Sequence, residues 1–86
     1  METPEIKIEA LLSFLQQCSK KQLQILGVER FFGREGGKVT DIGGIADFSS
    51  LPIGNVEKSI SATKEYLSHY GKDNSEVFRV TYLKIE

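Results

Sequence analysis

The chain has 86 residues, of which 40% are apolar and 27% are charged, which is typical of one small folded domain and excludes a disordered chain. Eleven basic and twelve acidic side chains give a net charge of −1, which argues against wholesale electrostatic binding to nucleic acid or to an anionic membrane. The one cysteine, Cys18, cannot form an internal disulfide, and no apolar run approaches the roughly 18–20 residues of a membrane span. We therefore expect a cytoplasmic protein.

Residues 1–35 predict two helices that support the rest of the domain. Thr3-Pro4-Glu5 is typical of a helix start, because a capping hydroxyl precedes a proline and an acid. Apolar side chains then follow at helical spacing, on two neighbouring stripes of this first helix. Ser19-Lys20-Lys21-Gln22 has the pattern of a capping box, which predicts the start of a second helix. The core face of that second helix is expected to consist of Leu23, Ile25, Leu26, Phe31 and Phe32.

Residues 38–86 predict a longer series of short elements after a glycine-rich loop. Thr40 is expected to cap a brief helix that turns Ile42 and Ile45 inward. The longer helix that follows has one apolar face at helical spacing, and the last segment is rich in residues that favour strands. The elements are an edge strand at 38–40, the brief helix from Thr40, a polar turn at 48–52, a helix at about 53–67, a turn at 71–75 and a strand at 76–85.

This order of elements, together with the runs 39–46 and 51–60, resembles a winged helix-turn-helix domain. Ala46 occupies the place where such motifs need a small residue, and Leu51 and Val56 occupy the plug and inward-facing places. The chain is similar to the small winged-helix regulators of the multiple-antibiotic-resistance and arsenic-resistance repressor types. The resemblance implies one α+β domain over residues 1–86, with three to four helices and a short sheet or wing at the C-terminal end. Residues 1–35 would support and dimerise it, and residues 38–86 would form the helix-turn-helix core and wing.

The resemblance also implies a transcriptional regulator that binds duplex DNA, with the helix at about 53–67 in the major groove. The amide of Asn55 would then bond to adenine, since an amide can pair with that base through two hydrogen bonds. Lys58 would reach guanine or phosphate, and Ser61 a phosphate oxygen. The remaining DNA-binding residues are expected to be Thr40 before the turn, Gly54 at the helix start, where backbone amides can bind phosphate, and Lys72 at the tip of the wing.

The first helix offers apolar side chains on two sides, and the core of a chain this small can cover only one of them. A second copy related by a two-fold axis would bury the other side, so we expect a homodimer. Phe14 is the expected anchor of this contact. The predicted interface consists of Ile6, Leu11, Phe14 and Leu15.

An alternative is a winged-helix module that contacts proteins and does not touch DNA. The overall net charge of −1 favours it, and Glu57, Glu65 and Asp73 favour a helix face that is merely solvated or that meets a protein. A further alternative is an inhibitor or adaptor in which the helix-turn-helix shape is incidental.

Catalysis is not expected. Cys18 and His69 are conceivable as a catalytic pair, but nothing in the sequence orients them. The loop Gly33-Arg34-Glu35-Gly36-Gly37-Lys38 lacks the first glycine and the final Ser or Thr of a phosphate-binding loop. We therefore predict no enzyme activity, no cofactor and no metal site.

Overall fold

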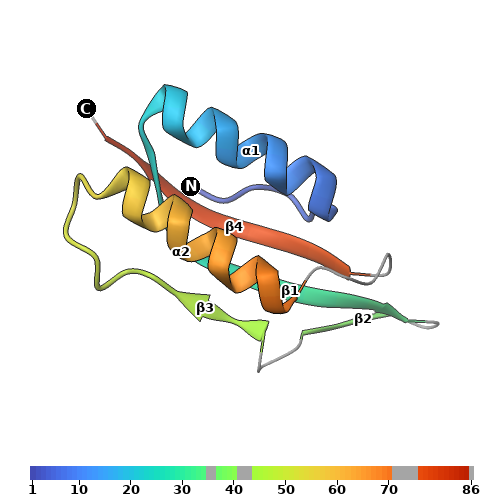
Figure 1. The fold of residues 1–86 in the computed structure, drawn as a ribbon. Coiled ribbons are helices and arrows are strands. Elements are labelled where there is room, and N and C mark those ends of the chain that lie inside the picture. Colours follow the sequence, from blue (N-terminus) through green and yellow to red (C-terminus); the bar gives the residue numbers. More distant parts are fainter. Residues whose placement is uncertain (35–36, 41–43, 71–75, 86) are drawn as a thin grey trace.

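The computed structural model of the chain describes residues 1–34, 37–40, 44–70 and 76–85, with only the course of the backbone for 32–34 and 37–40. In this part of the chain, two helices lie on one face of an antiparallel sheet (Figure 1). The elements in chain order are α1 (Ile8–Lys21), β1 (Leu23–Arg34), β2 (Gly37–Thr40), β3 (Ala46–Asp47), α2 (Val56–His69) and β4 (Glu76–Lys84).

The long strand β1 is the centre of the sheet. Strand β4 runs antiparallel along one side of it, with a register that extends from the pair Leu23 and Lys84 to the pair Phe32 and Glu76. Strands β2 and β3 both pair with the other side of β1, at different points along its length. The first and last parts of the chain therefore share one sheet (Figure 1).

The predicted start of the first helix is wrong, because the residues before α1 run extended and pair with the edge of β4 that does not face β1. Thr3 donates its N–H to the carbonyl of Val80 (2.9 Å), and its hydroxyl accepts the N–H of Val80 (3.0 Å). Ile6 and Phe78 exchange two backbone hydrogen bonds of 2.8 and 2.7 Å. Pairing with β4 thus satisfies these backbone groups, and α1 begins only at Ile8.

The predicted second helix is also wrong, because β1 occupies its place. Gln22 ends α1 with a positive φ of 55°, and its N–H bonds to the carbonyl of Cys18. Along β1, a bulge between Ile25 and Gly27 shifts the alternation of the strand by one residue. Ile25 and Val28 can therefore both lie in the core although they are three residues apart. This broken alternation resembles helical spacing in the sequence.

The winged helix-turn-helix fold is wrong as well, because the described residues form only two helices, and three strands separate them. Thr40 is the last residue of β2, and Ala46 lies in β3. Residues 41–43 of the predicted brief helix lie outside the described residues. By contrast, the helix expected at about 53–67 corresponds to α2, and the strand expected at 76–85 corresponds to β4.

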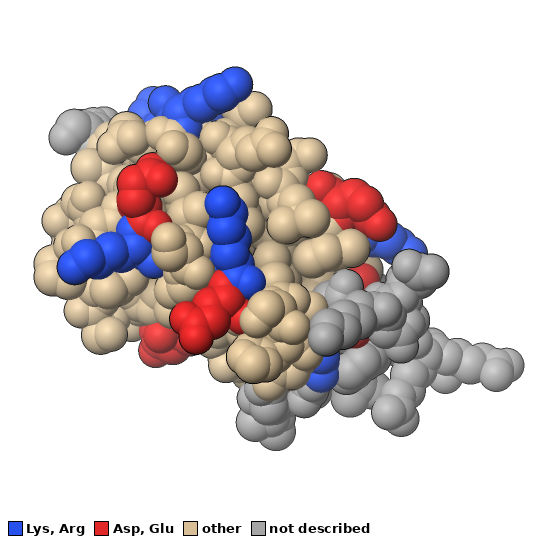
Figure 2. Space-filling model, viewed as in Figure 1, with Lys and Arg blue, Asp and Glu red and all other residues tan. Residues whose placement is uncertain are grey.

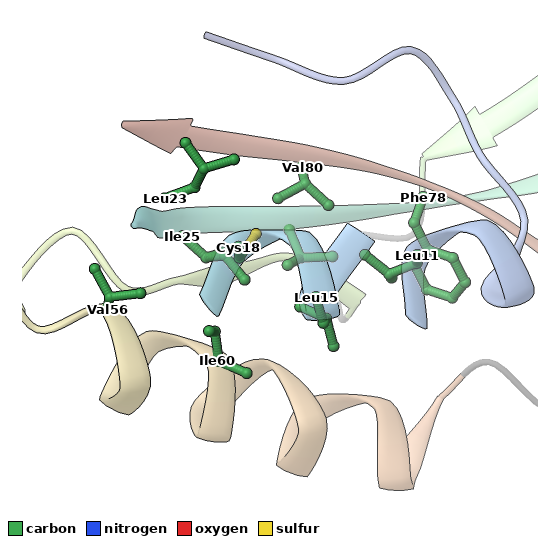
Figure 3. Close-up of a cluster of buried hydrophobic side chains, with 10 residues drawn as sticks. Leu11, Leu15, Cys18, Leu23, Ile25, Val56, Ile60, Phe78 and Val80 are labelled. Carbon is green, nitrogen blue, oxygen red and sulfur yellow. The ribbon is translucent and has the colours of Figure 1, made fainter. Parts of the chain in front are cut away.

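The core lies between the helix layer and the sheet, and both helices and both long strands contribute to it (Figure 3). The helices run antiparallel to each other over the same face of the sheet (Figure 1). One face of each helix thus packs on the strands, and the opposite face points outward. The buried apolar residues are Leu11, Leu15 and Cys18 of α1, Leu23, Ile25 and Val28 of β1, Val56 and Ile60 of α2, and Phe78 and Val80 of β4.

Candidate functional site

The start of α2 is held by the fully buried side chain of Gln24, in β1. Its Oε1 accepts the N–H of Gly54 (2.8 Å), and its Nε2 donates to the carbonyl of Pro52 (3.1 Å). The amide of Asn55 donates to the same Pro52 carbonyl (2.9 Å). The Gly54 N–H and the Asn55 amide, which were predicted to contact DNA, are therefore engaged within the chain. Gly54 also has a φ of 104°, a conformation that favours glycine.

Ser59 fixes which face of α2 turns toward the sheet. Its buried hydroxyl accepts the N–H of Ile25 (2.9 Å), at the bulge of β1, and donates to the carbonyl of Val56 (2.7 Å). This bond satisfies a strand N–H at the point where the bulge interrupts the regular pairing. Because Ser59 faces inward, Lys58 and Ser61 are exposed on the opposite face.

The other end of α2 is held by charged and aromatic side chains. Arg30 of β1 and Glu76 of β4 form an ion pair of 3.4 Å, with side-chain exposures of 11% and 5%. The guanidinium of Arg30 lies 4.3 Å from the ring centre of Tyr70, which in turn stacks on Tyr66 at 4.8 Å. The hydroxyl of Tyr66 donates to the carbonyl of Gly44. This cluster connects α2 to both long strands and to the segment before β3.

Four of the six predicted DNA-binding residues, Gly54, Asn55, Lys58 and Ser61, lie in or beside the first two turns of α2. Lys58 and Ser61 are exposed on α2, as the sequence suggested. Thr40 is in β2, and Lys72 lies outside the described residues. No helix precedes α2 closely in the described sequence, so its neighbour is α1, which runs antiparallel to it (Figure 1).

The predicted dimer residues contact parts of the same chain. Leu11 and Leu15 are 0% and 2% exposed, because they face the sheet and α2. Ile6 packs against the core beside β4, and Phe14 makes an edge-on contact with Tyr82 at 5.2 Å. Leu11 and Leu15 thus have no surface left to offer a second copy.

A groove of about 540 Å³ lies between α1 and α2, on the side of the helices that faces away from the sheet. Leu12 forms an apolar part of it and is 47% exposed, which is unusual for a leucine of this fold. The hydroxyl of Ser19 donates across the groove to Glu57 (2.9 Å) and connects the end of α1 to the start of α2. The groove is lined by Leu12, Leu15, Gln16, Ser19, Lys20, Glu57, Ile60 and Lys64.

The outward ridge of α2 carries charges of both signs. Glu57 and Lys58 are exposed in its first turn, and Lys64 and Glu65 are exposed two turns later. Figure 2 shows basic and acidic side chains interspersed over the face that bears the helices, with no patch of one sign among the coloured residues. Phosphate binding depends on a cluster of positive charge, and the described residues of this face form none.

The structure separates Cys18 from His69, the two residues conceivable as a catalytic pair. Burial raises the pKa of the Cys18 thiol to about 11, so this sulfur is protonated at neutral pH and a poor nucleophile. Cys18 is next to Ser19, whose hydroxyl contacts Glu57 at the start of α2. His69 is the last residue of α2, about 18 Å further along the helix axis. Over the described residues, no group of three or more His, Cys, Asp or Glu side chains could hold a metal ion.

Sequence reasoning placed Lys58 and Ser61 on an exposed face but missed the groove beside them. The contact between Ser19 and Glu57 joins residues 38 positions apart, and no local pattern indicates it. In the sequence, Leu12 is one more member of an apolar stripe of the first helix. In the structure it is exposed, because of the position of α2 beside α1.

A comparison of the chain with protein-family models, curated proteins and solved structures gave no match. In the part of the chain that the structure describes, neither helix has the length and apolar character needed to cross a membrane.

Proposed function

We propose that this chain is a protein-interaction domain that works as an adaptor through the outward face of its two helices. The observation that carries the proposal is the groove between α1 and α2, in which the exposed side chain of Leu12 is bordered by charges of both signs. An apolar centre with a polar rim is the usual composition of a protein interface.

The charge of the groove favours a protein partner over DNA. Lys20 and Lys64 border it together with Glu57, so a partner meets positive and negative groups within one surface. A protein can match both signs, whereas the DNA backbone offers only negative charge. The engaged amide of Asn55 further weakens the predicted base contact.

The cytoplasm remains the compartment that we propose. Cys18 is buried and carries a protonated thiol at neutral pH, and a lone free cysteine is ordinary in a reducing environment.

A displayed library of amphipathic helical peptides tests the proposal. Helices with an apolar stripe should be selected, and they should shift the backbone amide signals of the groove residues in NMR spectra. Leu12→Glu should abolish their binding, because a carboxylate would replace the apolar centre. Ile53→Glu is the matched control, since Ile53 is 71% exposed and lies outside the groove.

The predicted DNA contact is tested with the same spectra. Random-sequence duplex DNA is titrated at two salt concentrations, and signals of α2 should not move. Salt-dependent shifts at Lys58 and Ser61, with no helix selected from the library, would overturn the adaptor proposal in favour of DNA binding.

A further inference from the structure

The exposed charges of α2 are arranged in two pairs of opposite sign. Glu57 is followed seven residues later by Lys64, and Lys58 is followed seven residues later by Glu65. Residues seven apart lie nearly above each other on a helix, so each pair forms a stripe with one sign at each end. All four side chains are exposed on the outward ridge.

These charges are too far apart to stabilise α2 by pairing within it. Ion pairs along a helix form between residues three or four apart. Three to four residues after Glu57 and Lys58, the helix carries only Ile60, Ser61 and Ala62. A partner that matches both stripes would therefore have to span two turns of α2.

We propose that this partner is a second copy of the chain, whose α2 lies antiparallel to the first across a two-fold axis; the inference rests on the proposed interaction function. In this arrangement, Glu57 faces Lys64 of the second copy, and Lys58 faces Glu65 of the second copy. The two-fold axis repeats both contacts, so four ion pairs form. A parallel arrangement would instead place like charges together.

The surface around the charges fits this contact. Ser61 and Ala62 lie between the two charged ends, in a shallow depression that Glu57, Lys58 and Glu65 also line. Their short side chains let a second helix approach closely. Glu57 and Lys64 also border the groove that contains Leu12, so the second copy lies at the rim of this groove.

The second copy is favoured over another partner because the charge pattern of α2 is complementary to itself only when it is reversed. Exposed ion pairs add little affinity each, but they select the partner and its direction. The contact also covers Lys58 and Ser61, so it excludes the predicted DNA contact on this face.

The experiment measures self-association by sedimentation equilibrium for the wild-type chain and for two charge variants. Lys58→Glu and Glu65→Lys each place like charges opposite each other twice per dimer, and each should weaken association about tenfold or more. Lys84→Glu is the control with the same charge change, since Lys84 is exposed at the end of β4. Circular dichroism should be the same for all variants.

Mixing the two variants is the decisive step. A chain with Lys58→Glu and a chain with Glu65→Lys have opposite charges at both contacts, so the mixture should associate although neither variant does alone. Association of the mixture restored to the wild-type level supports the inference. A mixture no tighter than its components overturns it.

The outcomes separate this inference from the proposed function. A wild-type chain that stays monomeric while selected helices bind its groove overturns the dimer and leaves the adaptor function intact. Wild-type association that neither charge variant weakens also overturns the α2 contact. A monomeric chain that binds no helix overturns both.

Discussion

The two ends of α2 are held to the sheet by different chemistry. At its start, uncharged groups of Gln24 and Ser59 bond to backbone atoms. At its end, the ion pair of Arg30 and Glu76 lies under the ring of Tyr70. The uncharged hydrogen bonds do not depend on the protonation of a carboxylate, whereas the charged end loses more stability when one partner is removed. One helix is thus anchored at both ends, and its stability is more sensitive to the loss of one side chain at the charged end.

The largest effect is expected at the charged end. Glu76→Ala should lower the free energy of unfolding by about 3–5 kcal/mol, because it removes one partner of a buried ion pair. Urea denaturation measures this change. Glu9→Ala, at an exposed position in the first turn of α1, should cost less than about 1 kcal/mol.

A double variant sharpens this prediction. Arg30→Leu combined with Glu76→Leu should be more stable than Glu76→Ala, because replacing both charges leaves neither one buried alone. A Glu76→Ala chain as stable as Glu9→Ala would show that the ion pair does not anchor this end.

The second effect is expected at the uncharged end. Gln24→Leu should lower the free energy of unfolding by about 2–4 kcal/mol, because the Gly54 N–H and the Pro52 carbonyl lose their buried partner. Hydrogen exchange should accelerate in the first turn of α2 more than in its last turn. The control is Gln17→Leu, since Gln17 is exposed on α1. Uniform acceleration along α2 would contradict a separate anchor at its start.

Ser59→Ala should have a smaller effect, a loss of about 1–2 kcal/mol. It leaves the Ile25 N–H without its acceptor, but alanine is the better helix former and offsets part of the cost. Ser61→Ala is the matched control, because Ser61 lies two residues later on the exposed face of α2. It should change stability by less than about 0.5 kcal/mol. Equal stability of the two variants would show that the bulge does not need this hydroxyl.

The smallest effect is expected for Tyr66→Phe, which removes one hydrogen bond to Gly44 at a cost of about 1 kcal/mol. Its pH dependence is more informative. Burial raises the pKa of Tyr66 to about 12 from an ordinary value of 10.0, so the folded chain keeps this proton after the unfolded chain has released it. Stability should therefore fall as the pH rises from about 10 to about 12. The fall should be shallower in Tyr66→Phe, and identical profiles would contradict the burial of this phenol.

The elements that the sequence predicted well are those whose pattern is uninterrupted. The apolar face of α2 and the run of strand-forming residues in β4 repeat without a break, and both elements lie close to their predicted positions. The elements predicted wrongly depend on long-range contacts. The bulge at Ile25 hides the period of β1, and the backbone of Thr3 is extended because Val80 pairs with it from 77 residues away.

The candidate site follows the same division. The exposure of Lys58 and Ser61 follows from the helical period of α2. The engagement of the Gly54 N–H depends on Gln24, 30 residues earlier in the chain, and no local signal in the sequence indicates it. The burial of Leu11 and Leu15 likewise follows from the position of β1, which replaces the second of the two helices predicted for residues 1–35.

The extended residues before α1 have a consequence for aggregation. Strand β4 is rich in residues that favour strands, and its outer edge would otherwise present unpaired backbone groups to other molecules. Thr3 and Ile6 bond to this edge at Val80 and Phe78, so they occupy the positions where a strand of another molecule would start to pair. The segment therefore blocks edge-to-edge pairing of β4 with a strand of another molecule, which is the first step toward fibres.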